Sequence, residues 1–189
     1  MHPGRPILCT AQAHVTGGRT AGHGRSSDGA LEVDLRTPVE MGGSGGGTNP
    51  EQLFAVGYAA CFESALGAAG RRRRQEVGDV AIDSTVMLVP TPDRRYKLAV
   101  ALAVTLPSVE DPDEAVELVR AADRLCPYSN ATRGNIEVSL TVNGRDVEET
   151  SAPAVLLLPP VACHPVLRTR DARGPGVPRP GPRRVERLI

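Results

Sequence analysis

The chain has 189 residues, and its 22 basic and 22 acidic side chains give a formal charge of zero. The charge is unevenly spread, because residues 151–189 hold seven arginines against two acids, which leaves the first 150 residues with a net charge of −5. A mildly acidic main body argues against nucleic acid as the principal partner.

The N-terminal stretch MHPGRPILCTAQAH has neither the apolar stretch nor the small-residue cleavage site of a signal peptide. No run approaches about 18 uninterrupted apolar residues, the length that a membrane-spanning helix needs. We therefore expect a cytoplasmic protein with no membrane partner.

Two strands are predicted at the start of the chain. Apolar residues alternate with mostly polar neighbours from Ile7 to Val15, which is typical of a strand, and Gly17-Gly18 end the pattern. A Ser-Asp-Gly turn then precedes residues 31–35, where leucine and valine recur at every second position. This alternation indicates a second strand.

A long apolar helix is predicted after the glycine-rich loop MGGSGGGTNP. Thr48 or Asn49 can cap it, and Pro50 suits its first turn. The apolar run ends near Ala69, and the arginines at 71–74 suit the negative end of a helix dipole. The helix is expected from about Pro50 to Ala69.

The second half of the domain is predicted to hold a hairpin, a helix and a strand. The runs VAIDSTVMLVP and YKLAVALAVTLP are rich in β-branched residues and are joined by TPDRR, a turn-like segment. Residues 111–125 form a helical pattern with acids in the first turn, and residues 136–142 alternate as a last strand. The predicted order ββαββαβ describes an α+β domain over residues 1–150.

The C-terminal residues 151–189 differ in composition from the rest of the chain. They hold eight of the 17 prolines, among arginine and glycine. We predict a disordered Pro/Arg-rich extension there. The alternative is a charged tail that binds nucleic acid or membrane.

The four cysteines at positions 9, 61, 126 and 163 make no CxxC motif and no zinc-binding spacing with the histidines, so no metal site is expected. Cys61 and Cys126 each fall on a predicted helix, and two helices packed on one sheet could bring them together. A reactive thiolate needs a nearby cation, which Arg19 in the loop directly after Gly17-Gly18 could supply, with Glu51 or Glu40 orienting it. The alternative is a pair of buried core cysteines with surface arginines.

Two segments, GTNPEQLFAVGYAACF and CPYSNATRGNIEVSLTV, resemble the signature segments of the organic hydroperoxide resistance (Ohr) proteins in the OsmC/Ohr family. TAQAHVTGGR, SSDG and LRTPVEMGG fit the same pattern, so the resemblance spans roughly residues 7 to 144. It implies the OsmC/Ohr-like fold of antiparallel sheets with two helices, assembled as an intertwined homodimer with interfacial active sites. The implied activity is a thiol peroxidase that acts on organic hydroperoxides in defence against oxidative stress.

The resemblance also implies roles for single residues. Cys61 resembles the peroxidatic cysteine, Cys126 the resolving cysteine, Arg19 the arginine that activates the thiolate, and Glu51 the acid that holds this arginine. No bound cofactor is implied, and the reductant would be a dihydrolipoyl group on a partner protein. Asp123 departs from the pattern, because the family usually has histidine there.

Helix geometry separates Glu51 from Cys61. Ten residues of α-helix rise roughly 15 Å and turn about 1000°, which puts the two side chains on different faces. If both serve one site, Glu51 must come from a neighbouring subunit, whereas the position of Arg19 does not decide which chain supplies it.

Phe54, Tyr58 and Phe62 could line an apolar pocket for the peroxide.

Three alternatives stay open at this stage. The first is an OsmC-type peroxidase of broader specificity, and the second is a non-enzymatic binding or redox-sensing protein. The third is phosphate binding by the glycine loop at residues 42–48, although this loop has neither a GK[ST] ending nor a GxGxxG pattern.

Overall fold

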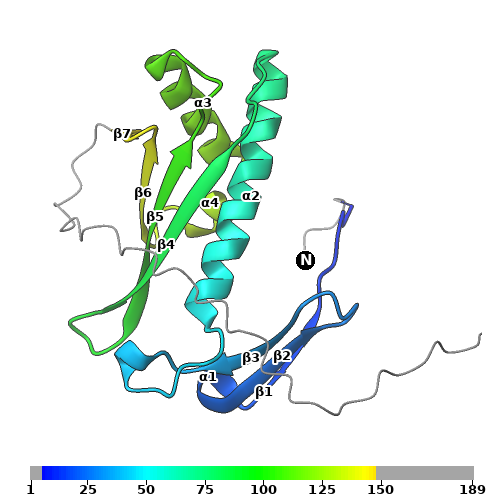
Figure 1. Cartoon of the computed structure of the whole chain (residues 1–189), viewed down its shortest axis with the longest axis vertical. Helices are drawn as coiled ribbons and strands as arrows, with labels where there is room; N and C mark the ends of the chain where they lie inside the picture. Colours follow the sequence, from blue (N-terminus) through cyan, green and yellow to red (C-terminus); the bar gives the residue numbers. More distant parts are fainter. Residues whose placement is uncertain (1–5, 148–189) are drawn as a thin grey trace, which may run out of the picture. The chain divides into compact units, whose positions relative to one another are not determined.

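The computed structural model describes residues 6–147 (Figure 1). The predicted extension at 151–189 lies outside the described residues. The elements follow one another as β1 (Ala13–Thr16), α1 (Gly18–Ala21), β2 (Gly22–Ser26), β3 (Glu32–Arg36), the 3-10 turn η1 (Val39–Met41), α2 (Pro50–Arg73), β4 (Ala81–Pro90), β5 (Tyr96–Thr105), α3 (Pro112–Leu125), α4 (Pro127–Thr132), β6 (Glu137–Val142) and β7 (Arg145–Asp146).

The strands form two sheets. The first is antiparallel with the order β1-β2-β3, and the second has the order β4-β5-β6-β7. Within the second sheet β5 and β6 run parallel, whereas the other neighbours are antiparallel. A parallel pair needs a crossover connection, and α3 with α4 supplies it. The predicted α+β class is confirmed, with a mixed second sheet in place of a purely antiparallel one.

Helix α2 begins where the local sequence predicts. The side chain of Asn49 accepts a hydrogen bond of 2.9 Å from the backbone N–H of Gln52, and Pro50 occupies the first turn. The helix extends past the predicted end to Arg73, and Arg74 closes it with a φ of 57°. By length and composition alone α2 could cross a membrane, a test that the core helix of a soluble protein also passes.

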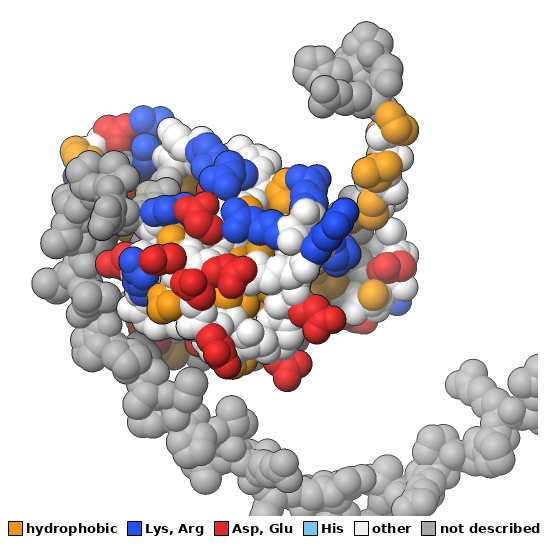
Figure 2. All heavy atoms as spheres, turned by 90° about the horizontal axis from the view of Figure 1, so that it is seen from above, with side chains coloured by type: hydrophobic (Ala, Val, Ile, Leu, Met, Phe, Trp, Pro, Cys, Tyr) orange, Lys and Arg blue, Asp and Glu red, His pale blue; other side chains and the backbone are white. Residues whose placement is uncertain are grey.

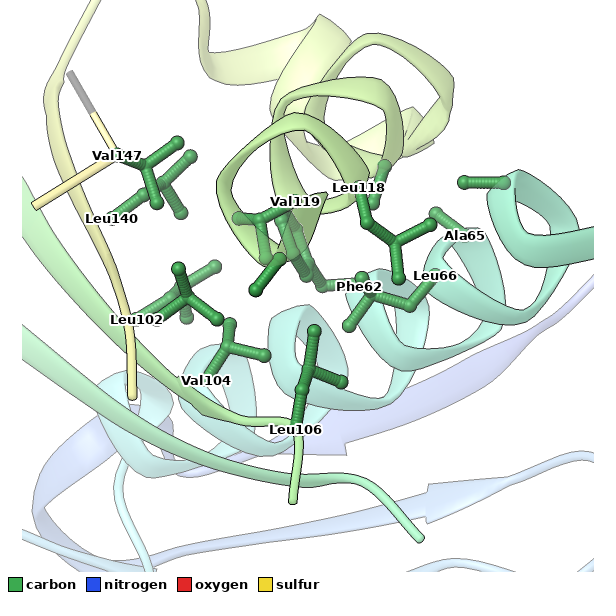
Figure 3. Close-up of a cluster of buried hydrophobic side chains, with 14 of the residues drawn as sticks. Phe62, Ala65, Leu66, Leu102, Val104, Leu106, Leu118, Val119, Leu140 and Val147 are labelled. Atoms are coloured by element: carbon green, nitrogen blue, oxygen red, sulfur yellow. The ribbon is translucent and has the colours of Figure 1, made fainter. Parts of the chain in front are cut away.

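The hydrophobic core lies between α2, α3 and the second sheet. Side chains from these elements point toward one another (Figure 3). Phe62 and Leu66 of α2, Leu118 of α3 and Leu106 after β5 are fully buried. Burial of a leucine or phenylalanine side chain contributes about 1.5–3 kcal/mol to stability. The core therefore fixes α2 against α3. It also positions Cys61, which lies in α2, and Cys126, which directly follows α3.

Several predicted elements differ from the structure. The first strand covers only residues 13–16, because residues 6–12 pair with no strand in the described part of the chain. The preceding residues Ile7 and Leu8 are exposed. Strand β2 was missed because its sequence, GHGRS, has glycine at alternate positions and no apolar periodicity. The short helices α1 and α4 were missed as well, since each has only one or two turns.

Acidic and basic side chains share the face of the molecule that Figure 2 shows. Arg71, Arg72 and Arg73 lie in the last turn of α2, where cations interact favourably with the carbonyl end of the helix. The distribution on this face is mixed rather than a continuous basic field.

Candidate active site

Cys61 and Cys126 meet at the packing contact between α2 and the start of α4. Their sulfur atoms lie 3.5 Å apart, and neither sulfur is bonded to another. Cys126 is buried, whereas Cys61 is partly exposed. A reaction between two cysteines requires such proximity. Here the Cys61 thiol is accessible to solvent, and the Cys126 thiol is buried next to it.

Local sequence explains the position of Cys126. Pro127 disfavours helical geometry for the residue before it, and Cys126 accordingly has an extended ψ of 122° between α3 and α4. Its backbone N–H still donates to the carbonyl of Ala122 at 2.8 Å, which closes α3. On the opposite side, the hydroxyls of Tyr58 and Ser129 lie 3.0 Å apart in a buried hydrogen bond. The bend after α3 is therefore anchored to α3 through the backbone of Cys126 and to α2 through the hydroxyl of Ser129.

Burial raises the pKa of the Cys61 thiol, and the neighbouring Cys126 adds to this effect. The backbone N–H of Tyr128 acts in the opposite direction, because its hydrogen bond stabilises the thiolate. Among residues 6–147, the causes of this pKa shift include no cation. Within the described part of the chain, no cation therefore lowers the pKa of Cys61.

Arg19 and Glu51 form an ion pair elsewhere in the chain. Nη2 of Arg19 lies 2.7 Å from Oε1 of Glu51, and the two side chains are 35% and 15% exposed. Gly17 and Gly18, with φ values of 69° and 60°, turn the chain sharply into α1 and so direct Arg19 toward α2. The alternative acid, Glu40, is exposed in η1.

Glu51 of the ion pair and Cys61 of the thiol pair lie in different parts of α2. Glu51 is in its first turn, and Cys61 comes ten residues later in the same continuous helix. This spacing corresponds to roughly 15 Å along the helix axis. The structure therefore brings the four predicted residues together as two pairs, Cys61 with Cys126 and Arg19 with Glu51.

The chain is similar in sequence to proteins of a known family. The family model described as OsmC-like protein matches residues 43–141. The chain is 49% identical to an organic hydroperoxide resistance protein of Xanthomonas axonopodis pv. citri over 138 residues, which are 72% of this chain and 95% of that protein. The chain belongs to the OsmC/Ohr family.

Solved structures of Ohr proteins agree with this assignment. An Ohr protein from Legionella pneumophila is 47% identical, with a TM-score of 0.69, over 72% of this chain and 98% of that one. OhrB of Bacillus subtilis is 44% identical, with a TM-score of 0.66, over 72% of this chain and 99% of that one. The OsmC/Ohr fold thus extends over 72% of this chain.

Within this OsmC/Ohr fold, one residue of the site was missed from the sequence. Tyr128 donates its backbone N–H to Cys61, and its ring lies 5.8 Å from that of Phe54 and 5.7 Å from that of Tyr58. An aromatic residue two positions after Cys126, in CPYSN, was the available signal. Tyr58 and Phe62, both expected in the pocket, are instead fully buried in the core.

The described residues, 6–147, contain no group of three or more His, Cys, Asp or Glu side chains that could hold a metal ion.

Proposed function

We propose that this protein is a thiol-dependent peroxidase that reduces organic hydroperoxides to alcohols in defence against oxidative stress. The observation that carries the proposal is the pair of thiols with sulfurs 3.5 Å apart, one partly exposed and one buried. Relatives at 49% and 45% identity, named for organic hydroperoxide resistance, support the substrate class. The proposed location is cytoplasmic, where a reducing environment would return the oxidised cysteines to thiols.

The proposed reaction has three steps. The Cys61 thiolate attacks the distal oxygen of the hydroperoxide, the O–O bond breaks, and the alcohol leaves while Cys61 becomes a sulfenic acid. Cys126 then attacks the Cys61 sulfur, so that a disulfide forms and water is released. An external dithiol reduces the disulfide by exchange. A dihydrolipoyl group on a partner protein is our proposed reductant, with no cofactor bound by the chain itself.

The pKa of Cys61 supports an active site shared between two copies. Burial raises this pKa, while Arg19 lies with Glu51 roughly 15 Å away along α2. A second copy of the chain could place its own Arg19–Glu51 pair beside Cys61 and lower the pKa of the thiol. We therefore propose a homodimer in which each ion pair serves the Cys61 of the other copy.

One face of α2 supports such an assembly. Gln52, Val56 and Ala60 recur at every fourth position, so they form a single exposed row along the helix. Val56 is 71% exposed. A second copy would remove this apolar surface from water.

The ring cluster near Cys61 supports a preference for organic peroxides. The ring of Tyr128, two residues after Cys126, packs against that of Phe54 and is 38% exposed. An alkyl group could bury apolar surface there, whereas hydrogen peroxide has no apolar surface to bury.

The experiment is a steady-state assay that compares cumene hydroperoxide with hydrogen peroxide, with dihydrolipoamide as reductant. The proposal expects turnover with cumene hydroperoxide and a lower kcat/KM with hydrogen peroxide. Equal kcat/KM values would favour the OsmC-type alternative. Oxidation of Cys61 without turnover would favour a redox sensor. A Cys9→Ser variant is the matched control, because Cys9 is an exposed cysteine outside both residue pairs.

A further inference from the structure

The bend between α3 and α4 presents two groups to Cys61. Cys126 holds its sulfur 3.5 Å from that of Cys61, and Tyr128, two residues later, donates its backbone N–H to the same sulfur. Bonded sulfurs lie about 2.05 Å apart, so the bend must bring Cys126 closer by about 1.5 Å when a disulfide forms. Contacts that hold the bend therefore influence how often Cys126 comes within reach.

Asp123 and Arg133 connect the two ends of this bend. Asp123 lies one turn before Cys126, and Arg133 directly follows α4. Nη2 of Arg133 lies 2.8 Å from Oδ2 of Asp123 and also donates to the backbone carbonyl of Asp123 at 3.0 Å. This carbonyl belongs to the last turn of α3, where the helix offers no partner of its own. One guanidinium nitrogen thus binds both the side chain and the backbone at the end of α3.

The ion pair lies beside a cavity at the surface of the core. Asp123 and Arg133 line a cavity of about 190 Å³, together with Tyr58 and Ser129. The Asp123 side chain is only 16% exposed, whereas that of Arg133 is half exposed. The ion pair therefore lies at the edge of the packed core, where its polar contacts add to the buried hydrogen bond between Tyr58 and Ser129.

We propose that Asp123 and Arg133 are a positioning pair that holds Cys126 within reach of Cys61 and so favours disulfide formation over further oxidation. The inference rests on the proposed function for its consequence in catalysis.

Two reactions compete for the sulfenic acid of Cys61. In one, the Cys126 thiolate attacks the Cys61 sulfur, the S–O bond breaks, and the oxygen leaves as water after it takes up a proton. In the other, the sulfenate attacks a second hydroperoxide, which is reduced to its alcohol while Cys61 becomes a sulfinic acid. A bend that spends less time in the closed geometry shifts the product from disulfide to sulfinic acid.

The test uses the full chain with Asp123→Asn, Arg133→Gln or Arg133→Lys. The first measurement is the equilibrium constant of the Cys61–Cys126 disulfide in dithiothreitol redox buffers, which needs no hydroperoxide. The second is the ratio of sulfinic acid to disulfide, by mass spectrometry, after reduced protein meets increasing cumene hydroperoxide. The matched control is Asp113→Asn, which breaks an exposed ion pair of 2.7 Å with Arg145 at the other end of α3.

In Asp123→Asn and Arg133→Gln we expect the equilibrium constant for forming the Cys61–Cys126 disulfide to fall by about three- to tenfold. The ratio of sulfinic acid to disulfide should rise by about the same factor. This is the range for charge-assisted hydrogen bonds with one partner half exposed. Arg133→Lys should lie between these variants and wild type, because lysine keeps the charge but not the planar donor geometry. The control should match wild type in both measurements.

The inference is overturned if Asp123→Asn and Arg133→Gln match wild type in both measurements. It is also overturned if Asp113→Asn changes them equally, since the effect would then be general loss of stability. The proposed function fails separately if wild type forms the disulfide in redox buffer but is not oxidised by cumene hydroperoxide. In that outcome the redox-buffer constants alone support or overturn the role of the pair.

Discussion

The two residue pairs of the candidate site are held in different ways. Cys61 and Cys126 lie at the edge of the hydrophobic core, where packing of α2 against α3 sets the distance between their sulfurs. Arg19 and Glu51 lie at the start of α2, where a sharp glycine turn and one ion pair of 2.7 Å set their geometry. The thiol pair is complete within one chain, whereas the ion pair lies roughly 15 Å along α2 from the Cys61 of the same chain.

The difference indicates a division of tasks. Two atoms that must form a bond have to be kept close to each other, which packing within one chain can achieve. A cation that lowers a pKa acts over several ångströms and can be carried by a second subunit. The thiol pair is therefore expected to respond to any change of its own atoms, and the ion pair to respond to changes of assembly.

The largest effect is expected from the cysteines themselves. Cys61→Ser should reduce turnover of cumene hydroperoxide by about 10³-fold or more, because no other side chain at the site can become a sulfenic acid. Cys126→Ser should allow one oxidation and then accumulate sulfinic acid, as seen by mass spectrometry. Undiminished turnover in either variant, with Cys9→Ser as control, would contradict the assigned roles.

Complementation between two inactive chains should sharpen the comparison. A Cys61→Ser chain co-expressed with an Arg19→Ala/Glu51→Ala chain should form a heterodimer with one intact site of two, and so roughly half of wild-type activity. The measurement is kcat of a heterodimer purified through two different tags.

The reversed combination is its control. A Cys61→Ser/Arg19→Ala chain paired with a Glu51→Ala chain should stay inactive, because Arg19 and Glu51 of one chain serve the same site. Activity in the reversed combination, and none in the first, would show that Arg19 acts on the Cys61 of its own chain.

The pH dependence of Cys61 should depend on Arg19. Burial raises the pKa of this thiol, and the cation is expected to lower it, so Arg19→Ala should move the pKa upward. Below the pKa, the thiolate fraction and the alkylation rate should fall about tenfold for each unit of the shift. At high pH the rates of variant and wild type should converge.

Iodoacetamide alkylation of Cys61 as a function of pH gives the measurement. Arg25→Ala is the matched control, since Arg25 is an exposed arginine of β2 whose carboxylate partner, Glu32, lies 3.9 Å away. An unchanged pH profile in Arg19→Ala would show that Arg19 does not lower the pKa of Cys61.

The smallest effect is expected where α2 meets α4. A Cβ at Gly57 would lie 3.0 Å from the hydroxyl oxygen of Tyr128, so in Gly57→Ala the ring must shift by a few tenths of an ångström. We expect activity to fall about two- to threefold, while the gain of about 1 kcal/mol in helix propensity offsets the strain.

Gly67→Ala on the same helix is the control for this prediction. Its Cβ would meet only a guanidinium nitrogen of Arg71, at 3.4 Å. It should raise the free energy of unfolding by about 0.5–1 kcal/mol and leave activity unchanged. Equal activity loss in both variants would point to the helix rather than to the Tyr128 contact.

Local sequence determined much of this protein. The cap at Asn49 and the proline at position 50 mark the start of α2, and Pro127 marks the end of α3 at Cys126. The alternation in the two runs around TPDRR likewise specifies β4 and β5. These signals act within a few residues, because capping, proline geometry and side-chain alternation depend on neighbours along the chain.

Other features were decided only by the tertiary structure. GHGRS has no strand periodicity and becomes β2 because β1 and β3 lie on both sides of it. Arg19 had two candidate acids in the sequence, and only the fold brings it to Glu51 rather than to Glu40. The cysteines, 65 residues apart, approach to 3.5 Å because core packing aligns α2 with the bend after α3. Contacts between distant residues depend on how whole elements pack, which no local pattern records.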